Sequence, residues 1–206
     1  MSTDNREVSA RLAPSQRRLQ RPPDFTGDRL RRFGQVFRRH GLPGAVLGAL
    51  LLLVPELRAT LADALAAFLA APGRYAVLGL MIFGVLSAWA WVIDRRIDRQ
   101  AVGWILYLLA LSTWEEWVFR LAIPELGQAL GVPLRVSVVF SNLLFGVVHY
   151  FTLRWKWQWC VGAFLGGMVL SRQLGTHDDL AFIIALHWVA TFINTPRLPG
   201  RLRSQG

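Results

Sequence analysis

Cysteine and lysine are almost absent from this chain of 206 residues. Cys160 is the only cysteine, which excludes an intramolecular disulfide, a cysteine-rich zinc cage and the two-cysteine ligand set of base deaminases. We interpret it as a small hydrophobic residue rather than a nucleophile. Lys156 is the only lysine, so arginine carries nearly all of the formal net charge of +10.

Charged residues are also scarce after the first 41 positions. Ten arginines and four acidic residues fall within the first forty residues, whereas almost everything that follows is apolar. Because this basic segment directly precedes long apolar runs, we predict a basic, poorly ordered tail over residues 1–41. We expect the tail to contact membrane lipids and no nucleic acid.

The long apolar runs predict an all-α, polytopic helical membrane protein with about six transmembrane helices. A helix needs about twenty residues to cross a bilayer. The run 43–71 is interrupted by the sequence PELR, and we interpret it as one kinked span followed by an interfacial segment, with a short hairpin as the alternative. The other predicted spans are 74–93, 103–123, 134–152, 160–173 and 179–194.

The positions of the basic residues predict the orientation of the chain. Six spans place the main basic loops and both tails on one side, which predicts that both termini are cytoplasmic. These loops and the C-terminal tail contain Arg95, Arg96, Arg99, Arg154, Lys156, Arg197, Arg201 and Arg203. The short, arginine-rich chain suggests a bacterial cytoplasmic membrane. The predicted parts are the tail 1–41, N-terminal transmembrane segments 42–99, a membrane core 100–195 and a basic C-terminal tail 196–206.

A few polar side chains lie inside the later predicted spans. A charged side chain near the centre of a membrane helix costs about 2.5–3.5 kcal/mol, so the polar faces of three helices should meet inside the bundle. The first helix carries Glu115, Glu116 and Arg120, the next carries Asn142 and His149, and the last carries His187, Thr191 and Asn194.

This set of residue types indicates acid–base chemistry. A carboxylate beside a neutral imidazole can take a proton from water, and a second imidazole or an amide can stabilise an oxyanion. A purely structural Glu116–Arg120 ion pair is the alternative for those two residues. No serine stands in a convincing triad, but Glu115, His149 and His187 could instead hold a divalent metal such as zinc.

The order of the motifs resembles the CPBP family, which comprises CAAX proteases and bacteriocin-processing enzymes and is also called the Abi family. The motif E-E-x-x-x-R covers Glu115 to Arg120, the motif F-x-x-x-H covers Phe145 to His149, and a later span contains His187. The resemblance extends over about residues 100–195. It implies an intramembrane endopeptidase that needs no cofactor and cleaves a membrane-associated protein or peptide.

The same resemblance implies a role for each motif residue. Glu115 and His149 would activate water, Glu116 and Arg120 would orient or tune them, and His187 would bind the oxyanion. The family has Asn four residues after this histidine, where this chain has Thr191. We therefore expect the missing hydrogen bond to come, in order of preference, from Thr191, Asn194 or Asn142.

The same buried polar residues are compatible with two other functions. A catalytically degenerate membrane scaffold or immunity protein would lack the hydrolytic activity. A proton or ion pathway would also use buried glutamate and histidine. His177, Asp178 and Asp179 are predicted to form the turn that caps the final helix. His40 ends the basic tail and is predicted to take no part in a site.

Overall fold

The computed structural model describes residues 18–25 and 27–199 of the chain. These residues are mainly helical and form no strand beyond isolated bridges between Gln20 and Trp155 and between Asp24 and Gly27. The predicted all-α class is therefore confirmed. Residues 1–17 of the predicted tail, together with Arg201 and Arg203, lie outside the described residues.

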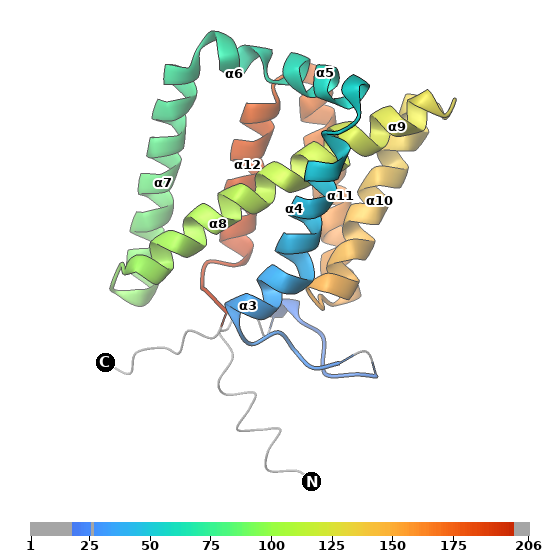
Figure 1. Cartoon of the computed structure of the whole chain (residues 1–206). Helices are drawn as coiled ribbons and strands as arrows, with labels where there is room; N and C mark the ends of the chain where they lie inside the picture. Colours follow the sequence, from blue (N-terminus) through green and yellow to red (C-terminus); the bar gives the residue numbers. More distant parts are fainter. Residues whose placement is uncertain (1–17, 26, 200–206) are drawn as a thin grey trace.

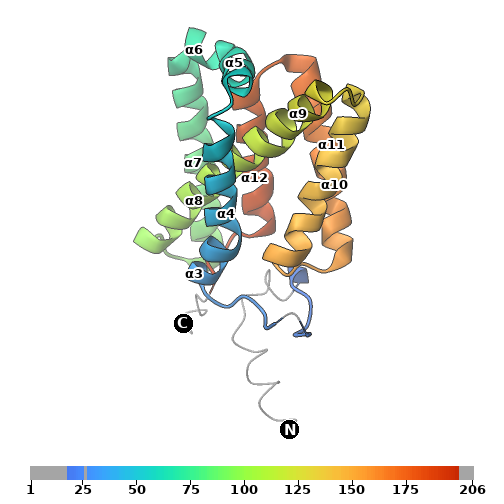
Figure 2. The same cartoon turned by 45° about the vertical axis from the view of Figure 1, so that its right-hand side comes forward.

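The helices are arranged as a bundle with one oblique member (Figure 1). The rod that begins at α3, and the helices α7, α10, α11 and α12, run along the bundle, whereas α8 crosses it diagonally (Figures 1 and 2). The elements are α3 (Phe33–Val36), the π-helix η1 (Phe37–Gly41), α4 (Leu42–Leu51), α5 (Pro55–Ala64), α6 (Ala66–Ala70), α7 (Pro72–Asp94), α8 (Arg99–Glu116), the π-helix η2 (Trp117–Ala122), α9 (Ile123–Ala129), α10 (Leu134–Thr152), α11 (Trp157–His177) and α12 (Leu180–Asn194).

Two of the described helices, Pro72–Asp94 and Leu134–Thr152, are long and apolar enough to cross a membrane. A third crossing follows if Phe33–Leu51 and Pro55–Ala64, which are bent by 106°, count as one broken span. The chain is thus a polytopic membrane protein, and six spans remain a prediction. The helix α12 is apolar, but it is shorter than the two helices that are long enough to cross a membrane.

The first apolar run turns sharply after α4. The α3–η1–α4 rod runs along the bundle, and α5 and α6 lie across its end before α7 returns (Figure 1). Pro55 begins α5, where its missing N–H is not needed. This geometry agrees with a kinked span followed by a transverse segment.

Prolines explain both π-helices of the described chain. Pro43 follows η1 by two residues, and Pro124 follows η2 by two residues. A proline inside a helix has no N–H to donate and its ring clashes with the carbonyl four residues earlier. The wider π turn relieves that clash, and such turns are frequent at functional sites.

Helix caps set the ends of the site-bearing helices. The Asp98 carboxylate accepts a hydrogen bond from the backbone N–H of Ala101 at the start of α8, over 2.9 Å. Asp179 caps α12 in the same way, accepting from the N–H of Phe182 over 3.0 Å. Asp178 has a φ of 50° and ends α11. The predicted capping turn before the final helix is therefore confirmed.

Tryptophan side chains fasten the oblique helix α8 and the segment after it to their neighbours. The indole N–H of Trp188 on α12 donates to the carbonyl of Ile105, and that of Trp104 donates to the carbonyl of Thr195, each over 2.8 Å. The indole N–H of Trp117 donates to the carbonyl of Gly48 on α4 over 2.9 Å. These bonds satisfy buried donors while the rings fill the core, and they fix α8 and η2 against α12 and α4.

The part of the predicted tail that the structure describes is ordered, so the prediction of poor order is wrong for residues 18–25 and 27–41. The backbone N–H of Lys156 donates to the carbonyl of Leu19, and the N–H of Arg21 donates to the carbonyl of Arg154, each over 2.8 Å. Leu19 and Leu30 are buried. Local composition missed this because the stabilising contacts come from the distant α10–α11 connection.

The basic connections lie at one end of the bundle. The α7–α8 and α10–α11 connections and the end of α12 are all on the side where α3 begins (Figure 1). The guanidinium of Arg197, after α12, lies 2.8 Å from the Asp94 carboxylate at the end of α7. The predicted common side is thus observed for the described residues, and its assignment to the cytoplasm remains a prediction.

Candidate active site

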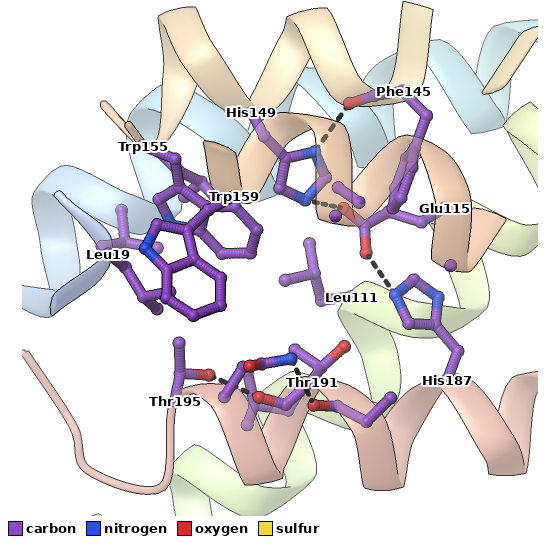
Figure 3. Close-up of a pocket in the computed structure, with 18 of the residues that line it drawn as sticks. Leu19, Leu111, Glu115, Phe145, His149, Trp155, Trp159, His187, Thr191 and Thr195 are labelled. Carbon is purple, nitrogen blue, oxygen red and sulfur yellow. Dashed lines mark hydrogen bonds and ion pairs between the residues drawn. The ribbon is translucent and has the colours of Figure 1, made fainter. Parts of the chain in front are cut away.

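The carboxylate of Glu115, near the end of α8, lies at the centre of a buried polar cluster. The Nε2 atom of His149 on α10 is 3.7 Å from Oε1 of Glu115. The Nε2 atom of His187 on α12 is 3.7 Å from Oε2. These two imidazoles approach the carboxylate from different helices (Figure 3). The prediction that the polar faces of three helices meet inside the bundle is confirmed.

Each of these imidazoles is oriented through its other ring nitrogen. Nδ1 of His149 lies 2.7 Å from the carbonyl oxygen of Phe145, one helical turn earlier. A carbonyl can only accept, so this nitrogen carries a proton, and in the neutral ring Nε2 then presents a lone pair toward Glu115. Nδ1 of His187 lies 2.6 Å from Oε1 of Glu116. That carboxylate stabilises a doubly protonated His187 ring, whose Nε2–H can then donate.

Glu116 and Arg120 form a fully buried ion pair beside this cluster. Nε of Arg120 lies 3.2 Å from Oε2 of Glu116, and neither side chain is exposed. The guanidinium also stacks over the ring of Phe145, 4.5 Å from its centroid. Because Glu116 contacts both Arg120 and His187, this pair holds the His187 ring in place. The ion pair is therefore structural and connected to the site at the same time.

A cavity of about 540 Å³ opens beside Glu115, His149 and His187. This volume lies within the range of about 300–1,000 Å³ that is typical of small-molecule sites. Most of its lining is apolar, including Leu111 on α8, Trp155 and Trp159, and Leu19 from the N-terminal segment (Figure 3). Gly162 and Gly166 also line it, which leaves room there instead of the close helix packing that small residues usually permit. The cavity can hold an apolar group against the polar cluster.

The segment that carries these motifs also matches a known protein family. Residues 97–193 match the family model described as Rce1-like, type II CAAX prenyl endopeptidase. This part of the chain is similar to that family. No curated protein and no solved structure matches the chain. The similarity points to the protease class, and the matched segment contains all the motif residues predicted above.

The three polar residues predicted to stabilise the oxyanion lie at different distances from the cluster. Thr191 lines the cavity one turn after His187. Asn194 also lines the cavity, but its amide donates to the carbonyl of Ala190 and its oxygen accepts from the Arg18 guanidinium over 3.4 Å, so both ends of the side chain are already bonded. Asn142 does not line the cavity, and its amide donates to Ser171 Oγ and to the carbonyl of Val138. Thr191 is therefore the best placed of the three.

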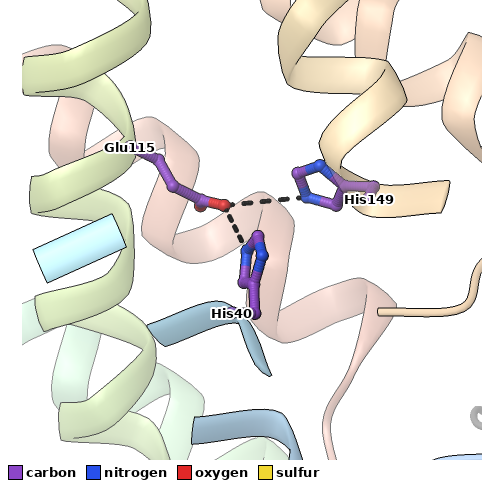
Figure 4. Close-up of side chains that lie close together, drawn as sticks. All are labelled: His40, Glu115 and His149. Atoms are coloured by element: carbon purple, nitrogen blue, oxygen red, sulfur yellow. Dashed lines mark hydrogen bonds and ion pairs between the residues drawn. The ribbon is translucent and has the colours of Figure 1, made fainter. Parts of the chain in front are cut away.

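His40 is the residue that the sequence interpretation missed. It is buried, and its Nε2 atom lies 2.8 Å from Oε1 of Glu115, closer than either of the predicted histidines (Figure 4). The prediction that His40 takes no part in a site is wrong. It lies in η1, outside the Rce1-like segment, and follows two arginines. The sequence feature that could have indicated its burial is its position directly before the apolar run that contains Pro43.

The side chains that could hold a metal ion differ from the set that the sequence predicted. Among the described residues, the metal-sized group is His40, Glu115 and His149, whose ligand atoms all lie within 4.8 Å of one another. His187 is not part of this group. Its Nδ1 contacts Glu116, and its Nε2 approaches Glu115 at the other carboxylate oxygen.

Proposed function

We propose that this protein is a membrane-embedded endopeptidase in which Glu115 and His149 activate a water molecule for attack on a peptide bond. The observation that carries the proposal is the convergence of His149 and His187 on opposite oxygens of the buried Glu115 carboxylate, beside an apolar cavity. The similarity of residues 97–193 to the Rce1-like family supports the same reaction class. The favoured mechanism uses no cofactor.

The first step is the activation of water. Oε2 of Glu115 accepts no hydrogen bond from the described residues, so it is available to take a proton. The lone pair of His149 Nε2 accepts the second water hydrogen and orients the oxygen. As the oxygen attacks the carbonyl carbon, one water proton passes to Glu115. A positioned general base of this kind typically contributes a rate factor of about 10²–10⁴.

The second step stabilises the charge that forms on the carbonyl oxygen. The Nε2–H of His187, kept protonated by Glu116, and the hydroxyl of Thr191 can both donate to it. One oxyanion donor is typically worth about 3–4 kcal/mol of barrier. The protonated Glu115 then donates its proton to the leaving nitrogen as the C–N bond breaks. This returns the carboxylate to its starting state.

The cavity indicates a substrate with an apolar group next to the cleaved bond. The family description names a prenyl endopeptidase, and a lipid-modified or strongly apolar peptide would fit the lining of Leu111, Trp155 and Trp159. The proposed substrate is a membrane-associated protein or peptide. A catalytically inactive scaffold would need no such cavity beside an ordered acid–base cluster.

The test compares membranes from cells that express the wild type, Glu115→Gln or the control Glu125→Gln, incubated in H₂¹⁸O. Peptide hydrolysis introduces ¹⁸O into each new carboxyl terminus, which mass spectrometry detects. We expect labelled termini with the wild type and the control, and none with Glu115→Gln. Glu125 is a glutamate of α9 outside the cluster. Labelled termini that persist in Glu115→Gln, or that never depend on the wild-type protein, would overturn the proposal.

A further inference from the structure

His40 adds a third polar atom to the side of Glu115 that faces His149. Nε2 of His40, Nε2 of His149 and Oε1 of Glu115 lie within 4.8 Å of one another, and all three residues are buried. Figure 4 shows both rings directed at the same carboxylate oxygen. In the proposed reaction His149 and Glu115 contact the water, and His40 serves only to position the Glu115 carboxylate.

Hydrogen bonding determines which ring nitrogen of His40 carries a proton. Nδ1 of His40 lies 2.7 Å from Oγ1 of Thr152. That hydroxyl donates its single hydrogen to the carbonyl of Val148, over 2.6 Å. It can therefore only accept from His40, so Nδ1 is the donor and Nε2 of the neutral ring presents a lone pair. The Thr152 hydroxyl thus fixes the tautomer.

Two lone pairs and one carboxylate oxygen therefore face a single point. One proton can be shared between Nε2 of His40 and Oε1 of Glu115, which lie 2.8 Å apart. The same proton cannot also form a hydrogen bond to Nε2 of His149, which lies 3.7 Å from Oε1. A divalent cation placed between the three atoms would satisfy all of them. Imidazole nitrogens and carboxylate oxygens are ligands that zinc prefers, and three protein ligands with an open position are typical of its non-structural sites.

We propose that His40, Glu115 and His149 form a binding site for a divalent transition metal ion of the zinc class. The surrounding contacts match such a site, because metal-binding histidines usually donate their other N–H to a carbonyl or another acceptor. Tetrahedral zinc with bonds of about 2.0–2.1 Å separates its ligand atoms by roughly 3.3 Å. The observed separations of 2.8 and 3.7 Å lie on either side of that value. Glu115 and His149 also line the cavity, so the ion would face it.

The consequence for hydrolysis depends on the proposed function. An ion bound at Oε1 of Glu115 lowers the basicity of the carboxylate that the proposed mechanism uses to take a proton from water. It also occupies the lone pair of His149 Nε2. Metal binding and the metal-free reaction therefore compete for the same two side chains. Added zinc should lower the rate of hydrolysis, and chelation should restore it.

The site itself is tested by metal binding, without reference to activity. The full chain is purified in detergent, treated with a chelator and titrated with Co²⁺, whose visible absorption reports low-coordinate binding to nitrogen and oxygen ligands. We expect one equivalent of Co²⁺, displaced by Zn²⁺. His40→Ala should bind Co²⁺ about 10–100-fold more weakly than the wild type, whereas His177→Ala should bind Co²⁺ as tightly as the wild type. His177 is exposed on α11 and contacts Gln173.

Thr152→Val provides a second variant in case His40→Ala fails to fold. It keeps the side-chain shape, removes the acceptor for His40 Nδ1, and should weaken Co²⁺ binding by about 10–100-fold. Absence of saturable Co²⁺ binding to the wild type, or equal binding by the wild type, His40→Ala and Thr152→Val, would overturn the metal site.

Hydrolysis measured in the same preparations separates this proposal from the proposed function. Hydrolysis that continues with chelator and falls with Zn²⁺ supports both. Hydrolysis that requires Zn²⁺ supports the metal site and overturns both the metal-free mechanism and the expected inhibition. If labelled termini fail to form under either condition while Co²⁺ still binds, the peptidase proposal is overturned and the metal site stands.

Discussion

The imidazole of His40 lies 2.8 Å from the carboxylate of Glu115, although the two residues are 75 positions apart in the chain. This contact joins the N-terminal rod of α3, η1 and α4 to the end of α8. The ring is held on its other side by Thr152 of α10. One histidine thus connects three helices at the centre of the candidate active site.

Thr152→Val should slow metal-free hydrolysis without disturbing the fold. The change removes the hydroxyl that orients His40, and His40 in turn holds the Glu115 carboxylate that takes the proton from water. We expect kcat to fall by about tenfold and KM to change by less than about twofold, because the effect is on the reacting groups and not on binding. The measurement uses a substrate identified by ¹⁸O labelling. Thr113→Val is the matched control, since Thr113 makes the same bond to its own helix on an exposed face; a similar loss there would contradict the prediction.

Thr191→Asn should increase the rate. Asparagine stands at this position in the family that the motifs resemble, and its amide reaches further into the cavity than a threonine hydroxyl. We expect kcat to rise by about tenfold, whereas Thr191→Val should lower it by about 10²-fold if the hydroxyl is the oxyanion donor. Steady-state kinetics with the same substrate provide the measurement. Unchanged rates in both variants would show that Thr191 has no part in stabilising the oxyanion.

Arg120→Met should destabilise the protein strongly. It leaves the buried Glu116 carboxylate without its guanidinium, and removing one partner of a buried pair typically costs about 3–5 kcal/mol. The double variant Glu116→Leu with Arg120→Met should be more stable than the single one, because no unpaired charge remains. Denaturant unfolding in detergent, followed by tryptophan fluorescence, gives the free energies. Arg172→Met, at an exposed position of α11, should stay within about 0.5 kcal/mol of the wild type.

Gly167→Ala should destabilise the packing of α10 against α11. A Cβ at position 167 would collide with Oδ1 of Asn142 and lie 3.1 Å from a terminal nitrogen of Arg120. Overpacking of this kind costs about 1–3 kcal/mol. Gly175→Ala on the same helix meets nothing within 4 Å and should be neutral or stabilising by up to about 1 kcal/mol. The same unfolding measurement compares the two, and equal effects would contradict the proposed collision.

Much of the candidate site could be predicted because the membrane restricts where polar residues can point. Glu115, His149 and His187 lie on three apolar helices, and lipid would penalise any of them turned outward. Their side chains therefore had one acceptable direction, toward each other. The repeat of the helix then placed Glu116 and Arg120 one turn apart, where the structure shows their ion pair.

The same reasoning could not choose between the oxyanion candidates. Thr191 and Asn194 lie on one face of α12, and the sequence leaves open how deep the cavity reaches along that face. Both residues line the cavity, but the Asn194 amide already donates to the carbonyl of Ala190 on its own helix and lies one turn further from His187 than Thr191 does. Such differences of one helical turn depend on how neighbouring helices are tilted, which no local pattern records.

The sequence by itself determined the helical class, the membrane setting and the carboxylate–imidazole cluster, because apolar length and buried charge have few physical solutions. Only the tertiary structure decided that His40 belongs to that cluster. A histidine beside Arg38 and Arg39 has the local character of a solvated tail. What places it inside is the close contact of α4 with η2, where Gly48 accepts the Trp117 indole hydrogen bond. That contact depends on two segments 69 residues apart, and its energy arises only once they pack together.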